Sequence, residues 1–143
     1  MQKKVSFISL VSSIFSACTG EPDLHNFDVS IKNATNASLT LLAFNKNEFL
    51  FQDNLNNDEN SQSCIYSDEN FRGYYPNFCN VDSMVIKFST NRGYISTSST
   101  FDDFSFSNKR NPLLPNGGFE NINDTYEFLV TQEDYENAHE LPE

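Results

Sequence analysis

The chain has 143 residues and a formal net charge of −11, from 20 acidic and 9 basic residues. This acidic balance argues against binding to nucleic acid and against attachment to anionic lipid through a basic patch. The length is that of one domain with a core of its own.

The first element in chain order is a secretory signal. Lys3 and Lys4 precede an apolar run at residues 5–15, and the small residues Ser16 and Ala17 follow it. A basic start, a short apolar run and small residues before a cut site are the parts of a signal peptide. The run is too short to span a bilayer, which needs roughly 20 apolar residues. We expect a signal peptide at residues 1–17; a buried N-terminal strand is the alternative.

Cys18 gives this signal a specific character. Phe15-Ser16-Ala17-Cys18 resembles a bacterial lipobox, although the position of Phe15 usually holds Leu. The resemblance implies that Cys18 is acylated and becomes the first residue of the mature chain; an ordinary signal peptide with a nearby cysteine is the alternative. Removing residues 1–17 takes away two lysines and no acid, so the mature charge is −11 − 2 = −13. We expect residues 18–25 to form a polar tether, in which Pro22 opposes helix, and residues 26–143 to form the domain.

Cys64 and Cys79 are the two remaining cysteines. A secreted protein meets an oxidising compartment, so we expect them to pair. A metal site is the alternative, but the chain has only His25 and His139 and no Cys-x-x-Cys motif. We therefore predict a disulfide, no metal and no cofactor.

The first half of the domain has a strand pattern. Residues 27–32 alternate apolar and polar, which predicts a half-buried strand, and residues 38–44 predict its antiparallel partner. A third strand is expected at residues 48–52. Residues 53–63 are rich in oxygen ligands but lack the residue order and glycine of a calcium loop, so we expect a flexible solvated loop.

The second half continues this pattern. Residues 82–90 predict a strand, and Asn91-Arg92-Gly93 predicts a hairpin turn to a strand at 94–100. Residues 101–106 either continue that strand or form a short one, residues 108–118 are irregular, and residues 124–131 are the last strand. Thr131 to Asp134 reads as a capping box that opens a short helix, docked through Tyr135 and Ala138. The sequence thus predicts an all-β fold, an immunoglobulin-like antiparallel β-sandwich of seven or eight strands with a short C-terminal helical turn.

The segment between Cys64 and Cys79 is the candidate ligand-binding loop. Aromatic rings and a planar cation make binding surfaces for sugars, peptides or cations. The residues that we predict to bind are Phe71, Arg72, Tyr74 and Tyr75. The alternative is that the aromatic side chains pack inward and cap one end of the core.

Catalytic motifs are not evident. The sequence has no Gly-x-Ser-x-Gly, no His-Glu-x-x-His and no phosphate-binding loop. Paired carboxylates, Asp68 with Glu69 or Asp102 with Asp103, keep a glycosidase open as an alternative. We expect no enzyme but a binding module for a protein or a glycan. The alternatives are a structural envelope lipoprotein without a discrete ligand, and an inhibitor or immunity-type lipoprotein that binds a basic enzyme.

The whole pattern resembles small secreted β-sandwich lipoproteins of Bacteroidota. The resemblance rests on the lipobox, on Asp82-Ser83 followed by Ile86 and Phe88, and on a C-terminal motif of Tyr126, Phe128, Val130, Thr131, Asp134, Tyr135 and Ala138. It implies a sandwich fold and a lipid anchor (a palmitate-type acyl group on Cys18) in the cell outer membrane, on its surface or its periplasmic face. Such families mostly have no assigned function, so the resemblance names no partner beyond the membrane lipid.

Overall fold

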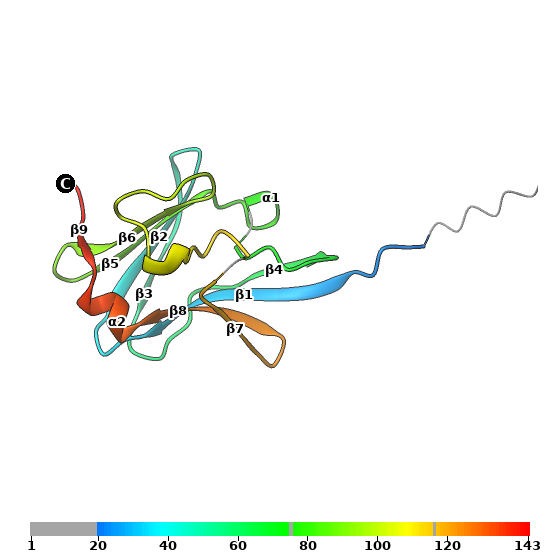
Figure 1. Ribbon diagram of the computed structural model, residues 1–143, viewed down its shortest axis with the longest axis horizontal. Helices are drawn as coiled ribbons and strands as arrows, with labels where there is room; N and C mark the ends of the chain where they lie inside the picture. Colours follow the sequence, from blue (N-terminus) through cyan, green and yellow to red (C-terminus); the bar gives the residue numbers. More distant parts are fainter. Residues whose placement is uncertain (1–19, 75, 116) are drawn as a thin grey trace, which may run out of the picture.

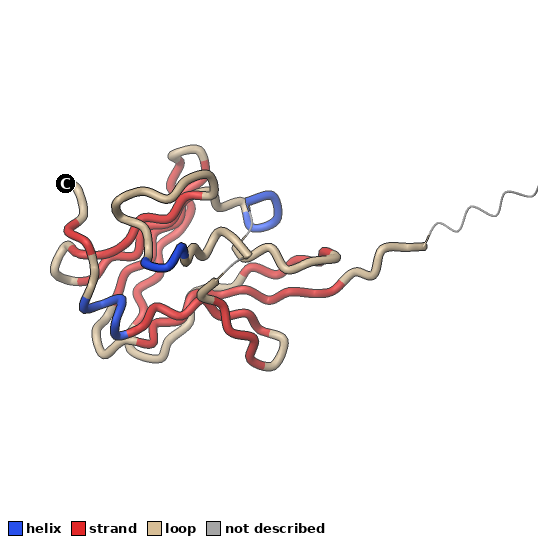
Figure 2. The backbone as a smooth tube through the Cα atoms, in the orientation of Figure 1, coloured by secondary structure: helices blue, strands red, loops and turns tan. Residues whose placement is uncertain are grey.

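Within residues 20–74, 76–115 and 117–143, which the computed structural model describes, nine strands form two sheets around an apolar core (Figure 1). The predicted signal peptide and Cys18 lie outside the described residues. The predicted all-β sandwich with a short C-terminal helix is confirmed. In Figure 2, strands account for most of the regular structure, and the helical segments are short.

The first sheet has the strand order β4-β1-β8-β7 and the second has the order β3-β2-β5-β6-β9. The first sheet consists of β4 (Cys64–Asp68), β1 (His25–Ala34), β8 (Thr125–Thr131) and β7 (Phe119–Ile122). The second consists of β3 (Glu48–Leu55), β2 (Leu39–Asn45), β5 (Ser83–Phe88), β6 (Arg92–Thr97) and β9 (His139–Glu140). The helical segments are α1 (Pro76–Cys79), the 3₁₀ turn η1 (Ser107–Lys109) and α2 (Gln132–Glu136).

Alternation along the strands builds the core, because successive side chains of a strand point to opposite faces. In the first sheet, β1 and β8 bury Val29, Ile31, Phe128 and Val130. In the second, β2 and β5 bury Leu39, Leu41, Ala43, Met84, Ile86 and Phe88. Full burial of each large apolar side chain contributes about 1.5–3 kcal/mol.

One strand pair departs from the predicted antiparallel arrangement. β1 and β8 run parallel, with Val29 opposite Tyr126 and Ile31 opposite Phe128. Parallel neighbours need a long connection, and here almost the whole domain lies between the two strands. Alternation within each strand carries no signal for such a distant pairing.

The predicted pairing of residues 27–32 with 38–44 is wrong. β1 and β2 lie in different sheets, and β2 pairs with β3 and β5 instead. The crossover between them is held by buried hydrogen bonds of Asn33: its Oδ1 accepts from Thr35 N at 3.0 Å, and its Nδ2 donates to Leu55 O at 3.0 Å. These hydrogen bonds pair the polar groups where the chain passes from the first sheet to the second. β1 and β2 are therefore joined by a crossover and not by a hairpin turn.

Three further predictions need correction. Residues 53–55 belong to β3, and the segment after them, although largely exposed, is tied to the edge of β1: Asn33 N donates to Glu59 O at 2.9 Å and Ser61 N to Ile31 O at 2.8 Å. Residues 101–106 form no strand. β4 and β7, by contrast, are strands that the sequence did not predict, because each is short and bordered by turn residues.

The C-terminal prediction is confirmed in detail. Thr131 caps α2 in a capping box, in which Asp134 N donates to Thr131 Oγ1 and Thr131 N donates to Asp134 Oδ2. Tyr135 packs against Phe88 with ring centroids 5.0 Å apart, and Ala138 is buried.

Candidate functional site

The predicted disulfide is present. Cys64 in β4 and Cys79 at the end of α1 are bonded, with their Cα atoms 5.6 Å apart. The loop that they close is also held by a backbone hydrogen bond to a distant segment, in which Tyr74 N donates to Pro112 O at 2.8 Å. Gly73 makes this approach possible, because its φ is +68° and a Cβ there would lie 2.7 Å from Leu114 O.

Tyr74 is a core residue. Its side chain is 2% exposed, and its hydroxyl donates to Gln62 O at 2.9 Å. Burial raises the pKa of its phenol. Tyr74 therefore fits the alternative that the aromatic side chains pack inward, and it also borders a cavity beside the disulfide. Tyr75 lies outside the described residues.

Arg72 lies on the surface, but it is already paired. Its Nε lies 3.2 Å from Asp68 Oδ2, and its backbone N–H donates to Tyr66 Oη at 2.9 Å. Partial burial raises the pKa of Asp68, but hydrogen bonds from Arg72 and from the backbone N–H groups of Glu69 and Asn70 outweigh it and hold this pKa below its ordinary value. The guanidinium therefore braces its own loop.

Phe71 lines a cavity at one end of the sandwich. Its ring stacks on Tyr126, with centroids 4.2 Å apart, and lies 5.6 Å from Phe27 and 5.0 Å from Phe119. Phe27 and Tyr126 are themselves 5.5 Å apart. The structure thus separates Phe71 from Tyr74: Phe71 joins an aromatic cluster at one end of the sandwich, and Tyr74 joins the core.

The cavity beside this cluster has a volume of about 610 Å³, and we call it the end pocket. It lies where β1 begins, where the chain leaves β4 and where the β7–β8 hairpin turns, at the end of the molecule from which residues 20–24 lead away (Figure 1). Its lining residues are His25, Asn26, Phe27, Glu69, Asn70, Phe71, Asp124 and Tyr126.

The rim of the end pocket is acidic. Glu69 and Asp124 are exposed, and neither makes an ion pair within the described part of the chain. Asp23 adds a carboxylate whose Oδ2 lies 3.9 Å from Nε2 of His25. Asp124 is placed by a tight turn, in which Asn123 and Asp124 both have positive φ, of 51° and 67°.

Sequence reasoning found Phe71 but missed the other lining residues. His25, Phe27, Asp124 and Tyr126 come from the two ends of the domain, and the parallel pairing of β1 with β8 brings them together. The local sequence signal that could locate Asp124 is the pair Asn123-Asp124 before the last strand, because this pair is typical of a hairpin turn.

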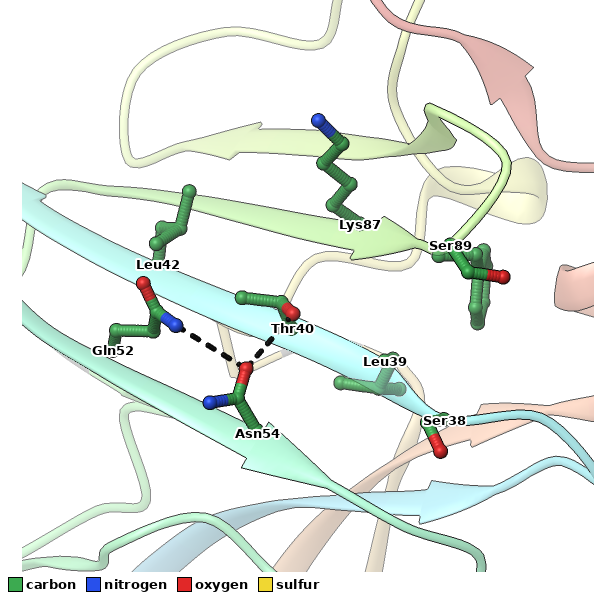
Figure 3. A pocket seen from close by; sticks show the side chains of 9 residues that line it. Ser38, Leu39, Thr40, Leu42, Gln52, Asn54, Lys87 and Ser89 are labelled. Atoms are coloured by element: carbon green, nitrogen blue, oxygen red, sulfur yellow. Dashed lines mark hydrogen bonds between the residues drawn. The ribbon is translucent and has the colours of Figure 1, made fainter.

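A second depression lies on the outer face of the five-stranded sheet (Figure 3). It measures about 420 Å³, and its floor includes Thr40, Gln52, Asn54 and Lys87. The polar groups there bond to one another, because Asn54 Oδ1 accepts from Thr40 Oγ1 at 3.0 Å and from Gln52 Nε2 at 3.2 Å. A third cavity, of about 410 Å³, lies beside the disulfide.

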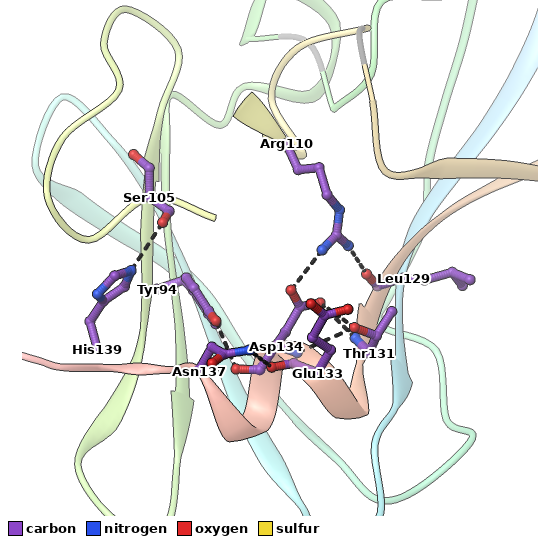
Figure 4. A network of polar contacts seen from close by, with 9 residues as sticks. All are labelled: Tyr94, Ser105, Arg110, Leu129, Thr131, Glu133, Asp134, Asn137 and His139. Atoms are coloured by element: carbon purple, nitrogen blue, oxygen red, sulfur yellow. Dashed lines mark hydrogen bonds and ion pairs between the residues drawn. The ribbon is translucent and has the colours of Figure 1, made fainter. Parts of the chain in front are cut away.

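Arg110 and the buried Asp134 form the centre of a structural network (Figure 4). Arg110 Nη1 lies 2.6 Å from Asp134 Oδ1, and Nη2 of Arg110 donates to Leu129 O. The guanidinium lies over the rings of Phe106 and Phe128, at 5.3 and 5.1 Å. Tyr94 Oη donates to Asp134 O at 2.7 Å. All of these groups are mutually satisfied, so the network ties β6, β8 and α2 together.

Across residues 20–74, 76–115 and 117–143, no group of three or more His, Cys, Asp or Glu side chains is arranged to hold a metal ion. The helices of the same residues include none that is both long and apolar enough to cross a membrane.

Comparisons of the chain with protein-family models, with curated proteins and with solved structures each found no match. The end pocket therefore carries the functional argument on its own geometry.

Proposed function

We propose that the chain is a lipid-anchored protein of the bacterial outer membrane that acts as a non-enzymatic binding module for a protein or a glycan. The observation that carries this proposal is the end pocket. It has aromatic walls, a polar rim and a volume of about 610 Å³, within the range of sites that hold a small ligand or a side chain of a partner.

The end pocket suits recognition. Phe27, Phe71 and Tyr126 pack against one another, so their rings are fixed before a ligand arrives. The walls offer ring surface and the rim offers amide and carboxylate groups, which are means of binding. Fixed rings cost little conformational entropy on binding.

The membrane address follows from the lipobox. An acylated Cys18 would be separated from His25 by 25 − 18 = 7 residues, which span at most about 25 Å. Because the end pocket lies where β1 begins, it would lie close to the lipid surface. This proximity suits a partner that is itself held at the envelope.

The experiment uses the full chain, extracted in detergent from the cells that produce it and labelled with ¹⁵N. We would titrate it with a neutral oligosaccharide, an acidic oligosaccharide, a lysine- and arginine-rich peptide and an acidic peptide. We expect at least one probe to shift the backbone resonances of Phe71 and Tyr126 saturably. Tyr126→Leu should weaken that probe by about tenfold, which is about 1.4 kcal/mol.

The matched control is Gln52→Ala in the depression on the outer sheet face, which should leave the titration unchanged. If no probe moves the pocket resonances, or if Gln52→Ala weakens binding as much as Tyr126→Leu, the proposal fails. The structural envelope lipoprotein without a discrete ligand would then replace it.

A further inference from the structure

We infer that the end pocket takes a cationic group, the ammonium of a lysine or the guanidinium of an arginine carried by a basic partner polypeptide. This inference rests on the binding function proposed above and specifies its ligand.

The walls of the end pocket suit a cation. A cation within about 6 Å of a ring centroid is attracted by the negative face of the ring. Phe27, Phe71 and Tyr126 supply three rings whose centroids are 4.2 to 5.6 Å apart, and His25 lies beside Phe27 with ring centroids 6.4 Å apart. Phe27 is buried behind the other two rings, so a cation in the end pocket meets the partly exposed rings of Phe71 and Tyr126.

The rim supplies the counter-charge. Glu69 and Asp124 lie on two different segments that meet at the end pocket, and neither has an ion-pair partner within the described ranges. A carboxylate pairs with an ammonium or guanidinium through short, charge-assisted hydrogen bonds. Asp23 adds a further carboxylate beside His25, which lines the end pocket.

Some acids elsewhere in the domain are neutralised by the basic side chains of the chain itself. Lys32 Nζ lies 2.8 Å from Asp58 Oδ1, and Arg72 and Arg110 pair with Asp68 and Asp134. In each of these places the acid is matched by a cation of the chain itself. Glu69 and Asp124, like most acids among the described residues, have no such partner, so both carboxylates can pair with a cation from outside.

The rings favour a cation over a neutral sugar. Phe71 and Tyr126 stack on each other, so each ring has one face covered by the other. A sugar needs a broad exposed ring face, whereas a compact cation interacts with a smaller area. The net charge of −11 would also steer a basic polypeptide toward the domain.

The test is calorimetric titration of the full chain in detergent with a lysine- and arginine-rich peptide, an acidic peptide of the same length, a neutral oligosaccharide and spermidine. We expect the basic peptide to bind more tightly than the other probes and to bind more weakly as salt rises. Glu69→Gln with Asp124→Asn should weaken the basic peptide by tenfold or more. The matched control, Glu48→Gln with Asp103→Asn, removes two exposed charges away from the end pocket and should change the affinity by less than about threefold.

The other outcomes overturn the inference in distinguishable ways. If the neutral oligosaccharide binds and is indifferent to Glu69→Gln with Asp124→Asn, the cationic ligand is wrong and the binding function stands. If spermidine binds more tightly than the peptide, the polypeptide source is wrong. If both double variants weaken binding equally, the end pocket is not the contact. If no probe binds, both this inference and the proposed function fall.

Discussion

At the scale of single residues, a few buried, hydrogen-bonded polar side chains hold the elements of the domain in place. Asp134 caps α2 through Thr131 and also receives Arg110, so one carboxylate fixes both the helix and the segment after η1. Its side chain is 4% exposed, and that of Arg110 is 18% exposed. A buried ion pair contributes little beyond an apolar pair of the same shape, but removing one partner leaves a charge without compensation.

We therefore expect Arg110→Ala to lower the free energy of unfolding by about 3–5 kcal/mol, measured by urea denaturation. The matched control is Arg72→Ala, because Arg72 also pairs with an aspartate but is exposed. An exposed pair is worth at most about 1 kcal/mol. Equal losses in the two variants would contradict the structural role of the Arg110–Asp134 pair.

The raised pKa of Tyr94 predicts that the folded protein loses stability at alkaline pH. Burial, aided by the charge of Asp134, raises the pKa of Tyr94 to about 12, whereas an unfolded tyrosine titrates near 10. Stability is therefore complete below pH ~10 and falls as the pH rises toward ~12, because the unfolded chain loses its proton first. This difference in pKa corresponds to a loss of about 3 kcal/mol in the free energy of unfolding.

The measurement for Tyr94 is denaturation across this pH range, together with spectrophotometric titration of tyrosinate. Tyr94→Phe should cost about 1 kcal/mol at neutral pH, because the hydrogen bond to Asp134 O is lost, and it should make the alkaline decline shallower. An unchanged slope in Tyr94→Phe would contradict the assignment of this decline to Tyr94.

At the scale of elements, short-range pattern predicted most of the strands. Alternation located β1, β2, β5 and β8, and the Thr131 capping box located α2, because these signals depend on neighbours in sequence. The pairing of β1 was wrong because alternation shows that a strand has a buried face but not which strand lies beside it. β4 and β7 were missed because each has too few residues to display a period.

The candidate site was only partly predictable for the same reason. Phe71 and the disulfide could be read from one loop, since both lie between Cys64 and Cys79. The partners of Phe71 could not, because Phe27 and Tyr126 become neighbours only through the parallel pairing of β1 with β8. Tyr74 has the same composition signal as Phe71, yet one turn at Gly73 sends it into the core.

The disulfide loop gives a prediction at this scale. The double variant Cys64→Ala with Cys79→Ala opens a loop of 15 residues, and the chain-entropy model puts the cost at about 3 kcal/mol. We expect a lower melting temperature and weaker binding at the end pocket, because the same loop carries Glu69 and Phe71.

Reduction of the unaltered chain should reproduce this effect, and the Ala variant should be insensitive to the reductant. A melting temperature that is unchanged by both treatments would show that the contacts of Tyr74 and Gly73 hold the loop without the bond.

At the scale of the whole molecule, the two ends of the domain have different tasks. α2 and the C-terminus lie at one end, where the Arg110–Asp134 network ties the sheets together (Figures 1 and 4). The end pocket lies at the other end, where the chain enters β1. Stabilising contacts and candidate binding groups are therefore separated along the long axis, so substitutions at the rim of the end pocket test binding without disturbing the network.

The anchor is the last prediction. If Cys18 carries the lipid, Cys18→Ser should move the protein from the membrane fraction to the soluble fraction, because the apolar run at residues 5–15 is too short to span a bilayer. Immunoblotting of the two fractions measures the shift, and Cys64→Ser, which leaves the anchor intact, is the control. Retention of Cys18→Ser in the membrane fraction would contradict lipid anchoring.

A second immunoblot, after protease treatment of intact cells, shows which class of partner can reach the end pocket. Protease added to intact cells removes a domain that faces outward and leaves one that faces the periplasm. Loss of the domain would direct the search for a basic partner to proteins outside the cell. Protection would direct the search to basic proteins of the periplasm. In that case a tether of seven residues would hold the end pocket within about 25 Å of the lipid surface.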